Sequence, residues 1–352
     1  MAQDIYNRHG GTTGNILHGI ITVKTPGKGS FNTQTKDLGH EHISSDEKAV
    51  VKIQSKYSGV TADQSYYSQN KLLGVNGLKG YFTTTEPGRL TQSGSAFDRT
   101  TQYATIWTDS IGGFTVSQVR TPNCPTVELG GLKKSVKNLE FDVSNDYLLK
   151  NYTDVGPTPD YNEWLPGANE SAMYVTVFRP LSFNQNNSAV WVLGGGNKQP
   201  NNGGFRGASL QFYESTKKLN FRGKTDTNIT KTNTISGVGT LIGKTIVHIG
   251  VRNLSQTGMY QWANDRRSTT NEIPAVPTGD NFKYVAGTGG LCIGSIQKAS
   301  FESFTPNMKF SLMAAYVRDT DFTVKEINKL GKSLASDYNV SWQEITDITV
   351  TE

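Results

Sequence analysis

The sequence has little of what marks several common protein classes. It contains two cysteines, Cys124 and Cys292, which are too few for a disulfide framework. Charged residues make up 18% of the chain, and the basic ones gather only in pairs such as Lys133–Lys134. A nucleic-acid surface needs a concentrated basic stripe, and a membrane span needs a longer apolar run than any present. We therefore expect neither nucleic-acid binding nor membrane insertion, and we expect Cys292 to be a buried free thiol.

Signals for secretion and for metal binding are also scarce. The first residues, Met-Ala-Gln-Asp-Ile-Tyr-Asn-Arg, lack the charged start and apolar core of a signal peptide, so we expect synthesis in a host cytoplasm without secretion. The five histidines show no zinc-type spacing with the cysteines. His40 and His42 share one face of an extended segment, which leaves a metal clip open, but we favour a solvated or subunit-contact role. No cofactor is expected.

Glycine, threonine, serine and asparagine are abundant, with 37 glycines in the chain. Threonine and aromatic residues fill pleated strands, whereas Gly and Asn supply positive φ at turns. The residues that long helices need, such as Ala, Leu and Glu, are comparatively few. The composition therefore predicts an all-β protein.

The first third of the chain predicts two segments. Residues 1–60 are polar and Gly-rich, with short strand-like pieces at 20–23 and 49–53, and they bury too little apolar surface to fold alone. We expect an extended arm that neighbouring subunits or other proteins hold. Residues 61–135 alternate β-branched and aromatic residues between turns, which predicts a small β domain for docking. Its expected strands are 80–85, 102–107 and 113–119.

From residue 136 to residue 345 the expected strands recur at regular spacing. So many strands must close into a sandwich or barrel, because bare edges invite aggregation. Two of them, 208–213 and 218–222, read as a hairpin, and Trp191 and His248 are expected on inner faces. Residues 346–352 form a tail. The expected strands are 137–143, 171–180, 189–194, 208–213, 218–222, 244–252, 258–264, 291–295 and 308–317.

One short helix is predicted near the C-terminus. Thr323-Val-Lys-Glu326 fits a capping box, in which the Thr hydroxyl accepts from the third helical amide while the Glu side chain reaches back. Ile327, Leu330, Leu334 and Tyr338 then recur on one face at helical spacing. We expect this stripe to pack against the core.

Four segments, in this order, resemble the laminin-G-like branch of the concanavalin A-like lectin and glucanase superfamily. Lys-Thr-Ile-Val-His-Ile-Gly-Val-Arg at 244–252 is similar to a family strand, and Met-Tyr-Gln-Trp-Ala-Asn-Asp at 259–265 is similar to the strand and turn after it. Leu-Cys-Ile-Gly at 291–294 and the run 309–327 resemble a later strand and the closing strand with its helix start. The resemblance covers residues 137–343 and implies a jelly-roll β-sandwich.

The chain departs from the family in three places. The turn Asn264-Asp265 lacks the family's glycine, so we expect another turn type there. Residues 151–168 look like an inserted loop. Residues 1–135 match no family, although their polar arm and Gly-, Thr- and Asn-rich strands resemble those of phage virion proteins.

The sequence shows no catalytic constellation. Glucanases of this superfamily cut with two carboxylates from one strand in a Glu-x-Asp-x-x-Glu arrangement, which no strand here carries. Glu344, Asp347 and Glu352 lie close together only near the end of the chain and at another spacing. A nucleophile elbow, a Walker loop and a His-Glu-x-x-His helix are also missing. We therefore expect a protein that is not an enzyme.

Two loops carry the residue types that sugar binding needs. Aromatic rings cover the C–H faces of pyranoses, and Asn, Asp and Gly groups bond their hydroxyls. In the alternative interpretation Trp164 covers an edge of the sandwich and the second loop is a flexible hairpin. Asp154 and Asp160 offer oxygens to calcium, but no acidic triplet is clustered, so no metal is predicted. The predicted glycan site is Tyr152, Asp154, Asp160, Tyr161 and Trp164 from the first loop with Asn197, Asn201, Phe205 and Arg206 from the second.

These features favour a non-enzymatic bacteriophage virion protein: a tail fibre, receptor-binding protein or capsid decoration protein. Its C-terminal domain would bind a host surface glycan or a partner surface. Residues 1–135 would dock onto other virion proteins, within a homo-oligomer. Two alternatives stay open: a glycan-degrading hydrolase with carboxylates from different loops, and a purely structural decoration protein.

Overall fold

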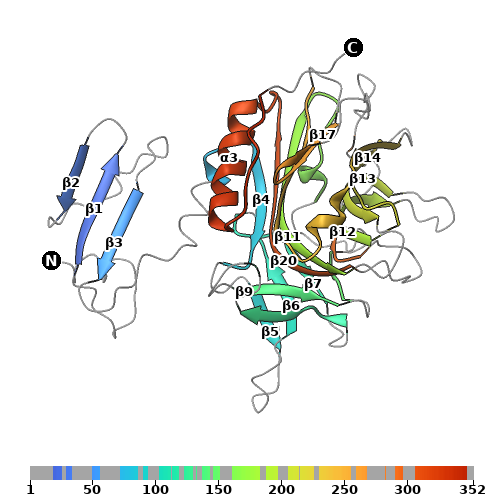
Figure 1. Cartoon of the computed structure of the whole chain (residues 1–352), viewed down its shortest axis with the longest axis horizontal. Helices are drawn as coiled ribbons and strands as arrows, with labels where there is room; N and C mark the ends of the chain where they lie inside the picture. The colour runs from blue at the N-terminus through green and yellow to red at the C-terminus, as the bar shows by residue number, and fades with distance from the viewer. Residues whose placement is uncertain are drawn as a thin grey trace. The chain divides into compact units, whose positions relative to one another are not determined.

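The chain divides into two compact units, Met1–Lys71 and Leu72–Glu352 (Figure 1). The backbone and side-chain arrangement comes from a computed structural model. The residues that it describes are 19–25, 29–33, 50–55, 72–85, 90–93, 103–111, 113–118, 123–129, 132, 137–142, 146–150, 161–182, 188–196, 205–213, 215–225, 230–254, 259–267, 282, 290–295 and 306–346.

The first unit contains a three-stranded antiparallel sheet in the order β2-β1-β3. Ile21 of the central strand lies opposite Thr33 on one side and Ile53 on the other. The strands predicted at 20–23 and 49–53 are thus confirmed, and backbone hydrogen bonds join them where we had expected only an extended arm. The strands are β1 (Gly19–Thr25), β2 (Gly29–Thr33) and β3 (Val50–Ser55).

The second unit is a β-sandwich of two antiparallel sheets, as the sequence predicted, with helix α3 outside one of them (Figure 1). We name the sheets after a strand of each. The β11 sheet has the order β17 (Met259–Ala263), β16 (Ile246–Arg252), β11 (Ser171–Ser182), β20 (Asn307–Arg318) and β4 (Leu78–Thr83). The β13 sheet has the order β10 (Leu148–Lys150), β19 (Gly290–Ile293), β12 (Ser188–Gly196), β13 (Phe205–Tyr213), β14 (Lys218–Lys224) and β15 (Thr230–Ile235).

Four strands connect the two sheets at one end, and β5 pairs with one of them, β6. Strand β9 pairs with β20, β8 pairs with β9 and β6, and β7 pairs with β6 and β10. A continuous series of strand pairings therefore joins the β11 sheet to the β13 sheet at this end. The strands are β5 (Leu90–Ser93), β6 (Tyr103–Thr108), β7 (Thr115–Ser117), β8 (Thr126–Leu129) and β9 (Lys137–Phe141).

The domain boundary that we predicted at residue 136 does not coincide with the boundary between the units. Strand β4 pairs with β20 in the β11 sheet, and β8 pairs with β9 across the predicted boundary. The described part of 61–135 from residue 72 onward thus belongs to the same compact unit as the sandwich. Local strand patterns carry no information on which distant strand each will pair with, so the sequence suggested a separate domain.

Strand β11 is buried on both of its faces. Tyr174 and Phe178 point into the core between the sheets, whereas Met173 and Val175 point to the opposite side, beneath α3. Antiparallel strands usually face water on one side, and here the helix takes the place of water. This explains why polar and apolar residues hardly alternate along β11.

Helix α3 (Val324–Asp337) confirms the predicted helix and its cap. The Thr323 hydroxyl accepts from the Glu326 amide at 3.2 Å, and the Glu326 carboxylate accepts from the Thr323 amide at 2.9 Å. Glu326 also pairs at 2.8 Å through each carboxylate oxygen with Arg318, whose guanidinium lies over the Phe322 ring. The predicted apolar stripe packs into the second core cluster, which includes residues from α3 and the β11 sheet.

Buried polar side chains bond one another in the core of the sandwich. Trp191 donates from Nε1 to the Thr176 hydroxyl at 2.9 Å, and His248 Nε2 lies 3.1 Å from Gln261 Oε1. Trp191 and His248 are fully buried, as predicted for inner-face residues. Cys292 is a buried free thiol, which is also as predicted.

The glycine-free turn between β17 and β18 (Arg266–Arg267) relies on Asn264. Its φ is 56°, a left-handed conformation that Asn tolerates better than most residues. The Asn264 side chain accepts from the Val247 amide at 2.8 Å and donates to the Thr245 carbonyl at 2.9 Å. These bonds anchor the turn to the neighbouring strand β16, so glycine is not required.

We predict that Glu326→Gln lowers the free energy of unfolding by about 1–2 kcal/mol at pH 7, since it weakens a bidentate ion pair and a helix cap together. The pair with Arg318 holds the pKa of Glu326 down at about 2. Its contribution is therefore present above pH 4.5 and is lost as the pH falls towards 2. Urea unfolding of both forms measures it. Glu344→Gln, which breaks an exposed pair with Lys332, is the control and should have almost no effect.

We predict that His248 makes the fold sensitive to acid. Burial lowers its pKa to about 4, below the unfolded value of about 6.5, so the folded state holds the ring neutral. Stability is full above pH 6.5 and falls by up to about 3 kcal/mol as the pH drops to 4. Thermal unfolding from pH 7 to 4 should therefore show a smaller acid loss in His248→Gln than in the native chain. Parallel pH curves for the two proteins would contradict this.

Candidate functional site

Two of the predicted glycan-site residues lie in the core of the sandwich. Tyr161 and Trp164 belong to the short helix η3 (Tyr161–Trp164) and are 1% and 0% exposed. The Trp164 ring lies 5.7 Å from that of Phe82 and 5.1 Å from that of Phe114, and the Tyr161 hydroxyl donates to the Thr115 carbonyl. Rings buried in this way offer no face to a sugar, so we assign both residues to packing. The alternative interpretation of Trp164 as a cover over the sandwich fits better.

Gly80 shows how tightly Trp164 is packed. A Cβ added at Gly80 would lie 2.4 Å from Trp164 Cζ2 and 2.7 Å from Asp109 Oδ2. Strand β4 therefore needs glycine where the indole crosses it.

The side-chain positions of the other predicted site residues are not described. Phe205 and Arg206 begin strand β13, but their side chains are outside the described part of the structure. The remaining predicted site residues, and the His40–His42 pair, lie outside the described residues: Tyr152, Asp154, Asp160, Asn197 and Asn201.

A different set of residues forms a polar surface on the β13 sheet. Apolar side chains such as Leu210 and Phe221 point into the core, so the residues that alternate with them point to the opposite face. Every described outward side chain of β13, β14 and β15 is polar. We call this surface the β14 face; it consists of Ser209, Gln211, Tyr213, Lys218, Asn220, Arg222, Lys224, Thr230, Thr232 and Thr234.

Hydrogen bonds connect the β14 face across its strands. Gln211 Oε1 accepts from Arg222 Nη1 at 3.0 Å and from the Tyr213 hydroxyl at 3.2 Å, while Gln211 Nε2 donates to Ser209. On the other side of β14, the Thr234 hydroxyl donates to Asn220 Oδ1 at 2.9 Å. Ser209, Gln211 and Asn220 are buried, whereas Tyr213 and Arg222 are half-buried. The network holds these side chains in fixed positions, as a binding surface requires.

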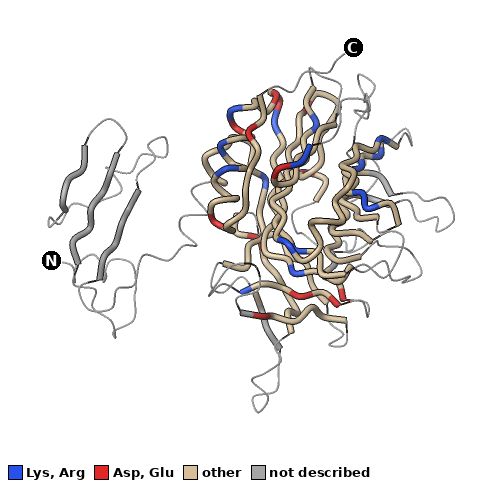
Figure 2. Tube along the Cα trace, viewed as in Figure 1, with Lys and Arg blue, Asp and Glu red and all other residues tan. Residues whose placement is uncertain are grey.

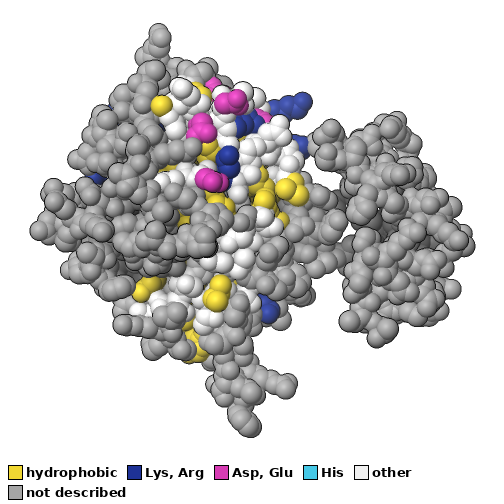
Figure 3. All heavy atoms as spheres, turned by 180° about the vertical axis from the view of Figure 1, so that it is seen from behind, with side chains coloured by type: hydrophobic (Ala, Val, Ile, Leu, Met, Phe, Trp, Pro, Cys, Tyr) yellow, Lys and Arg dark blue, Asp and Glu magenta, His cyan; other side chains and the backbone are white. Residues whose placement is uncertain are grey.

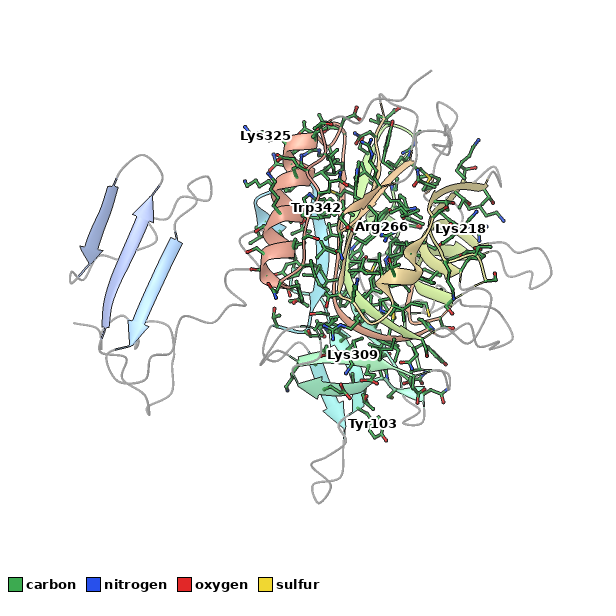
Figure 4. The ribbon with its side chains drawn as sticks, viewed as in Figure 1. Tyr103, Lys218, Arg266, Lys309, Lys325 and Trp342 are labelled. Carbon is green, nitrogen blue, oxygen red and sulfur yellow. The ribbon has the colours of Figure 1, made fainter. Side chains whose placement is uncertain are left out.

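The charge of the β14 face is of one sign. Lys218, Asn220, Arg222 and Lys224 occupy every second position of β14, so its three basic residues share this face. Figure 2 shows basic and no acidic residues along the described parts of β13 and β14. Lys218, labelled in Figure 4, lies on the β13 sheet, far from Lys325 on α3. The strict alternation of polar and apolar residues in 218–224 was visible in the sequence, where we interpreted it only as a hairpin strand.

A second charged cluster joins β8, β9 and β20. The Lys309 ammonium pairs with the carboxylates of Glu128 and Glu140, the latter at 2.9 Å. Burial is the main cause that raises the pKa of Glu140, whereas the hydrogen bond from Lys309 lowers that of Glu128. The single ammonium bridges the two acids, and the three residues connect the strands at this end of the sandwich.

Neither a metal cluster nor a membrane helix occurs in the described ranges. No group of three or more His, Cys, Asp or Glu side chains could hold a metal ion there. Every helix within these ranges is too short or too polar to span a lipid bilayer. In the rear view, acidic and basic side chains are interspersed, and exposed apolar atoms form only small separate groups among the described residues (Figure 3).

No protein-family model matches the chain, and no curated protein matches it. Similar solved structures include the Ruminococcus gnavus IT-sialidase CBM40 bound to alpha2,3 sialyllactose, with 12% identity and a TM-score of 0.37 over 45% of this chain and 80% of that one. Another is the Trypanosoma rangeli sialidase in complex with sialic acid, with 12% identity and a TM-score of 0.44 over 82% of this chain and 42% of that one. This chain thus spans less than half of that sialidase. Likenesses this weak carry no argument about function.

We predict that Trp164→Ala lowers the free energy of unfolding by about 3–5 kcal/mol, because it leaves a cavity among packed aromatic rings. Trp164→Phe keeps part of the packing and should cost clearly less. Urea unfolding of both variants measures this. A Trp164→Ala protein as stable as the native chain would instead return Trp164 to the list of ligand contacts.

Proposed function

We propose that the second unit is a carbohydrate-binding β-sandwich and that the β14 face is its binding surface. The observation that carries this proposal is the β14 face itself, an array of amide, hydroxyl and guanidinium groups on a regular sheet. Sugars are recognised by such groups, because each ring hydroxyl both donates and accepts hydrogen bonds. The face has no apolar side chain among its described members, so an apolar ligand would gain little there.

The spacing of the face suits an extended ligand. Neighbouring strands are about 4.8 Å apart, and outward residues on one strand are about 6.7 Å apart. Asn220 and Gln211 lie opposite each other on adjacent strands, and Arg222 is opposite Ser209. A saccharide lying across β13, β14 and β15 would therefore meet a hydrogen-bonding group at each strand. Tyr213 adds a half-buried ring at one edge, where the C–H face of a sugar can stack.

The wider setting in our proposal is a non-enzymatic virion protein of a bacteriophage. Its support is the sequence: a polar, Gly-rich first segment and a C-terminal part that resembles laminin-G-like members of the concanavalin A-like superfamily. The first unit would attach the chain to other virion proteins, with the sandwich directed to the host surface. A homo-oligomer fits this setting, since several weak sugar contacts then add in avidity.

The experiment is a glycan array probed with the full chain and with Gln211→Ala. The variant removes the acceptor that positions both Arg222 and Tyr213, so we predict at least tenfold weaker binding to any glycan that the native chain retains. Lys325→Ala on α3, an exposed position, is the matched control and should bind as the native chain does.

Three outcomes would contradict the proposal. Absence of any retained glycan would favour a purely structural decoration protein. Equal binding by Gln211→Ala and the native chain would place the site elsewhere. Cleavage of a retained glycan by the purified chain would favour the hydrolase.

A further inference from the structure

Asp146 is a buried carboxylic acid on the connection between β9 and β10. It is 4% exposed, and its Oδ2 accepts from the Asp142 amide at 2.9 Å. Among the described residues, no lysine, arginine or histidine forms an ion pair with this carboxyl. A carboxylate that leaves water without gaining a cation is unstable in its charged form, so the site favours the protonated acid.

The charged groups that face Asp146 from β9 are themselves acidic. Asp142 and Glu140 bring negative charge, and Lys309, labelled in Figure 4, is already shared between Glu140 and Glu128. The carboxyl groups of Asp142 and Asp146 also hydrogen-bond each other, which requires a proton on one of them because a carboxylate only accepts. Burial, followed by these acidic neighbours, raises the pKa of Asp146 to about 7.

The other elements packed against Asp146 supply no positive charge. The Cys124 thiol, from the segment before β8, has its pKa raised by burial and then by the charge of Asp146. Gly294 follows β19, and a Cβ added there would lie 2.9 Å from the Asp146 carbonyl oxygen. Asp146 is therefore in close contact with the end of β19, and neither neighbour compensates a carboxylate.

Asp146 lies where the strand pairings pass from one sheet to the other. Strand β9 pairs with β20 of the β11 sheet, whereas β10 pairs with β19 of the β13 sheet and with β7. Leu148, two residues after Asp146, is fully buried opposite Ile293. Because β10 has only three residues, few backbone hydrogen bonds hold it. A short strand of this kind opens locally when the free energy of a neighbouring group changes.

We propose that Asp146 is a proton-controlled latch on β10. With its proton, the carboxyl stays between Asp142 and the end of β19, and β10 remains paired with β7 and β19. Without the proton, two adjacent carboxylates repel each other where little water screens them, so β10 separates from its partners more often. The latch is separate from the proposed glycan binding, since β10 lies at one edge of the β13 sheet and β15 at the other.

The direction of the pH dependence follows from the two states of the latch. In the open state Asp146 is solvated and titrates near its ordinary pKa of 3.8, whereas in the closed state it titrates near 7. The stabilisation by the proton is therefore fully present below pH 3.8 and is lost as the pH rises to about 7. The equilibrium constant for opening should rise about 50-fold from pH 5 to pH 7, and only about twofold more by pH 8.

Hydrogen exchange of the full chain measures this opening. The protection factor, which compares each observed rate with the intrinsic rate at the same pH, is followed for the amides of β10 and Asp142 from pH 5 to pH 8. We expect protection of β10 in the native chain to fall about 50-fold between pH 5 and pH 7. Asp146→Asn keeps an oxygen for the Asp142 amide but never ionises, so its protection should change less than about threefold.

Two further variants and one internal reference complete the test. Asp265→Asn makes the same substitution at an exposed acid and should keep the native pH profile. Asp142→Asn removes the adjacent charge, so the fall in protection should be smaller and end at a lower pH. This variant decides the question if Asp146→Asn does not fold. The amides of β11, which is buried on both faces, report global opening and should be better protected than those of β10 at pH 8.

Three results would overturn the latch. The first is constant protection of β10 in the native chain between pH 5 and pH 7. The second is a fall in Asp146→Asn as large as that in the native chain, or an unchanged profile in Asp142→Asn, because another group would then be responsible. The third is equal protection of β10 and β11 at every pH, because the opening would then be global.

Discussion

Burial of strand β11 on both faces is the constraint on which the rest of the second unit depends. Between β16 and β20, this strand has its backbone groups paired on both edges, with one core cluster on each side. An antiparallel sheet in that position needs a cover, which α3 supplies through its apolar stripe, and the Arg318–Glu326 pair secures the start of that helix. The outer side of the β11 sheet is thus covered by α3 and contributes to stability. The β14 face belongs to the other sheet.

Much of this architecture could be predicted from local sequence. The capping box and the apolar stripe at 327–338 define α3 without any tertiary information. In both signals, each residue interacts with or recurs at a position only three or four residues away in the sequence. The hairpin of β13 and β14 was equally visible in its alternation. That residues 72–135 belong to the same unit as the sandwich could not be predicted, because the pairing of β4 with β20 joins segments more than two hundred residues apart. The residues of a strand specify its faces, but its partners depend on the whole chain.

For a related reason, the burial of two predicted site residues could not be read from the sequence. Trp164 and Tyr161 were chosen because aromatic residues in a polar loop are typical of sugar binding. Their burial depends on Phe82 and Phe114, which are distant in sequence and converge only in the folded chain. By contrast, the alternation of polar and apolar residues at 218–224 already indicates which side chains of β14 share the β14 face. The face contains few aromatic residues, and an evenly polar strand resembles an ordinary solvated one in the sequence.

The central claim is that the sandwich binds its ligand on the face of a sheet and not on its loops. The most direct measurement is a crystal structure of the full chain soaked with the glycan that it retains most strongly. The account predicts sugar density across β13, β14 and β15, within hydrogen-bond distance of Arg222 and Asn220. Density confined to the loop around residues 151–160, with the β14 face empty, would contradict it.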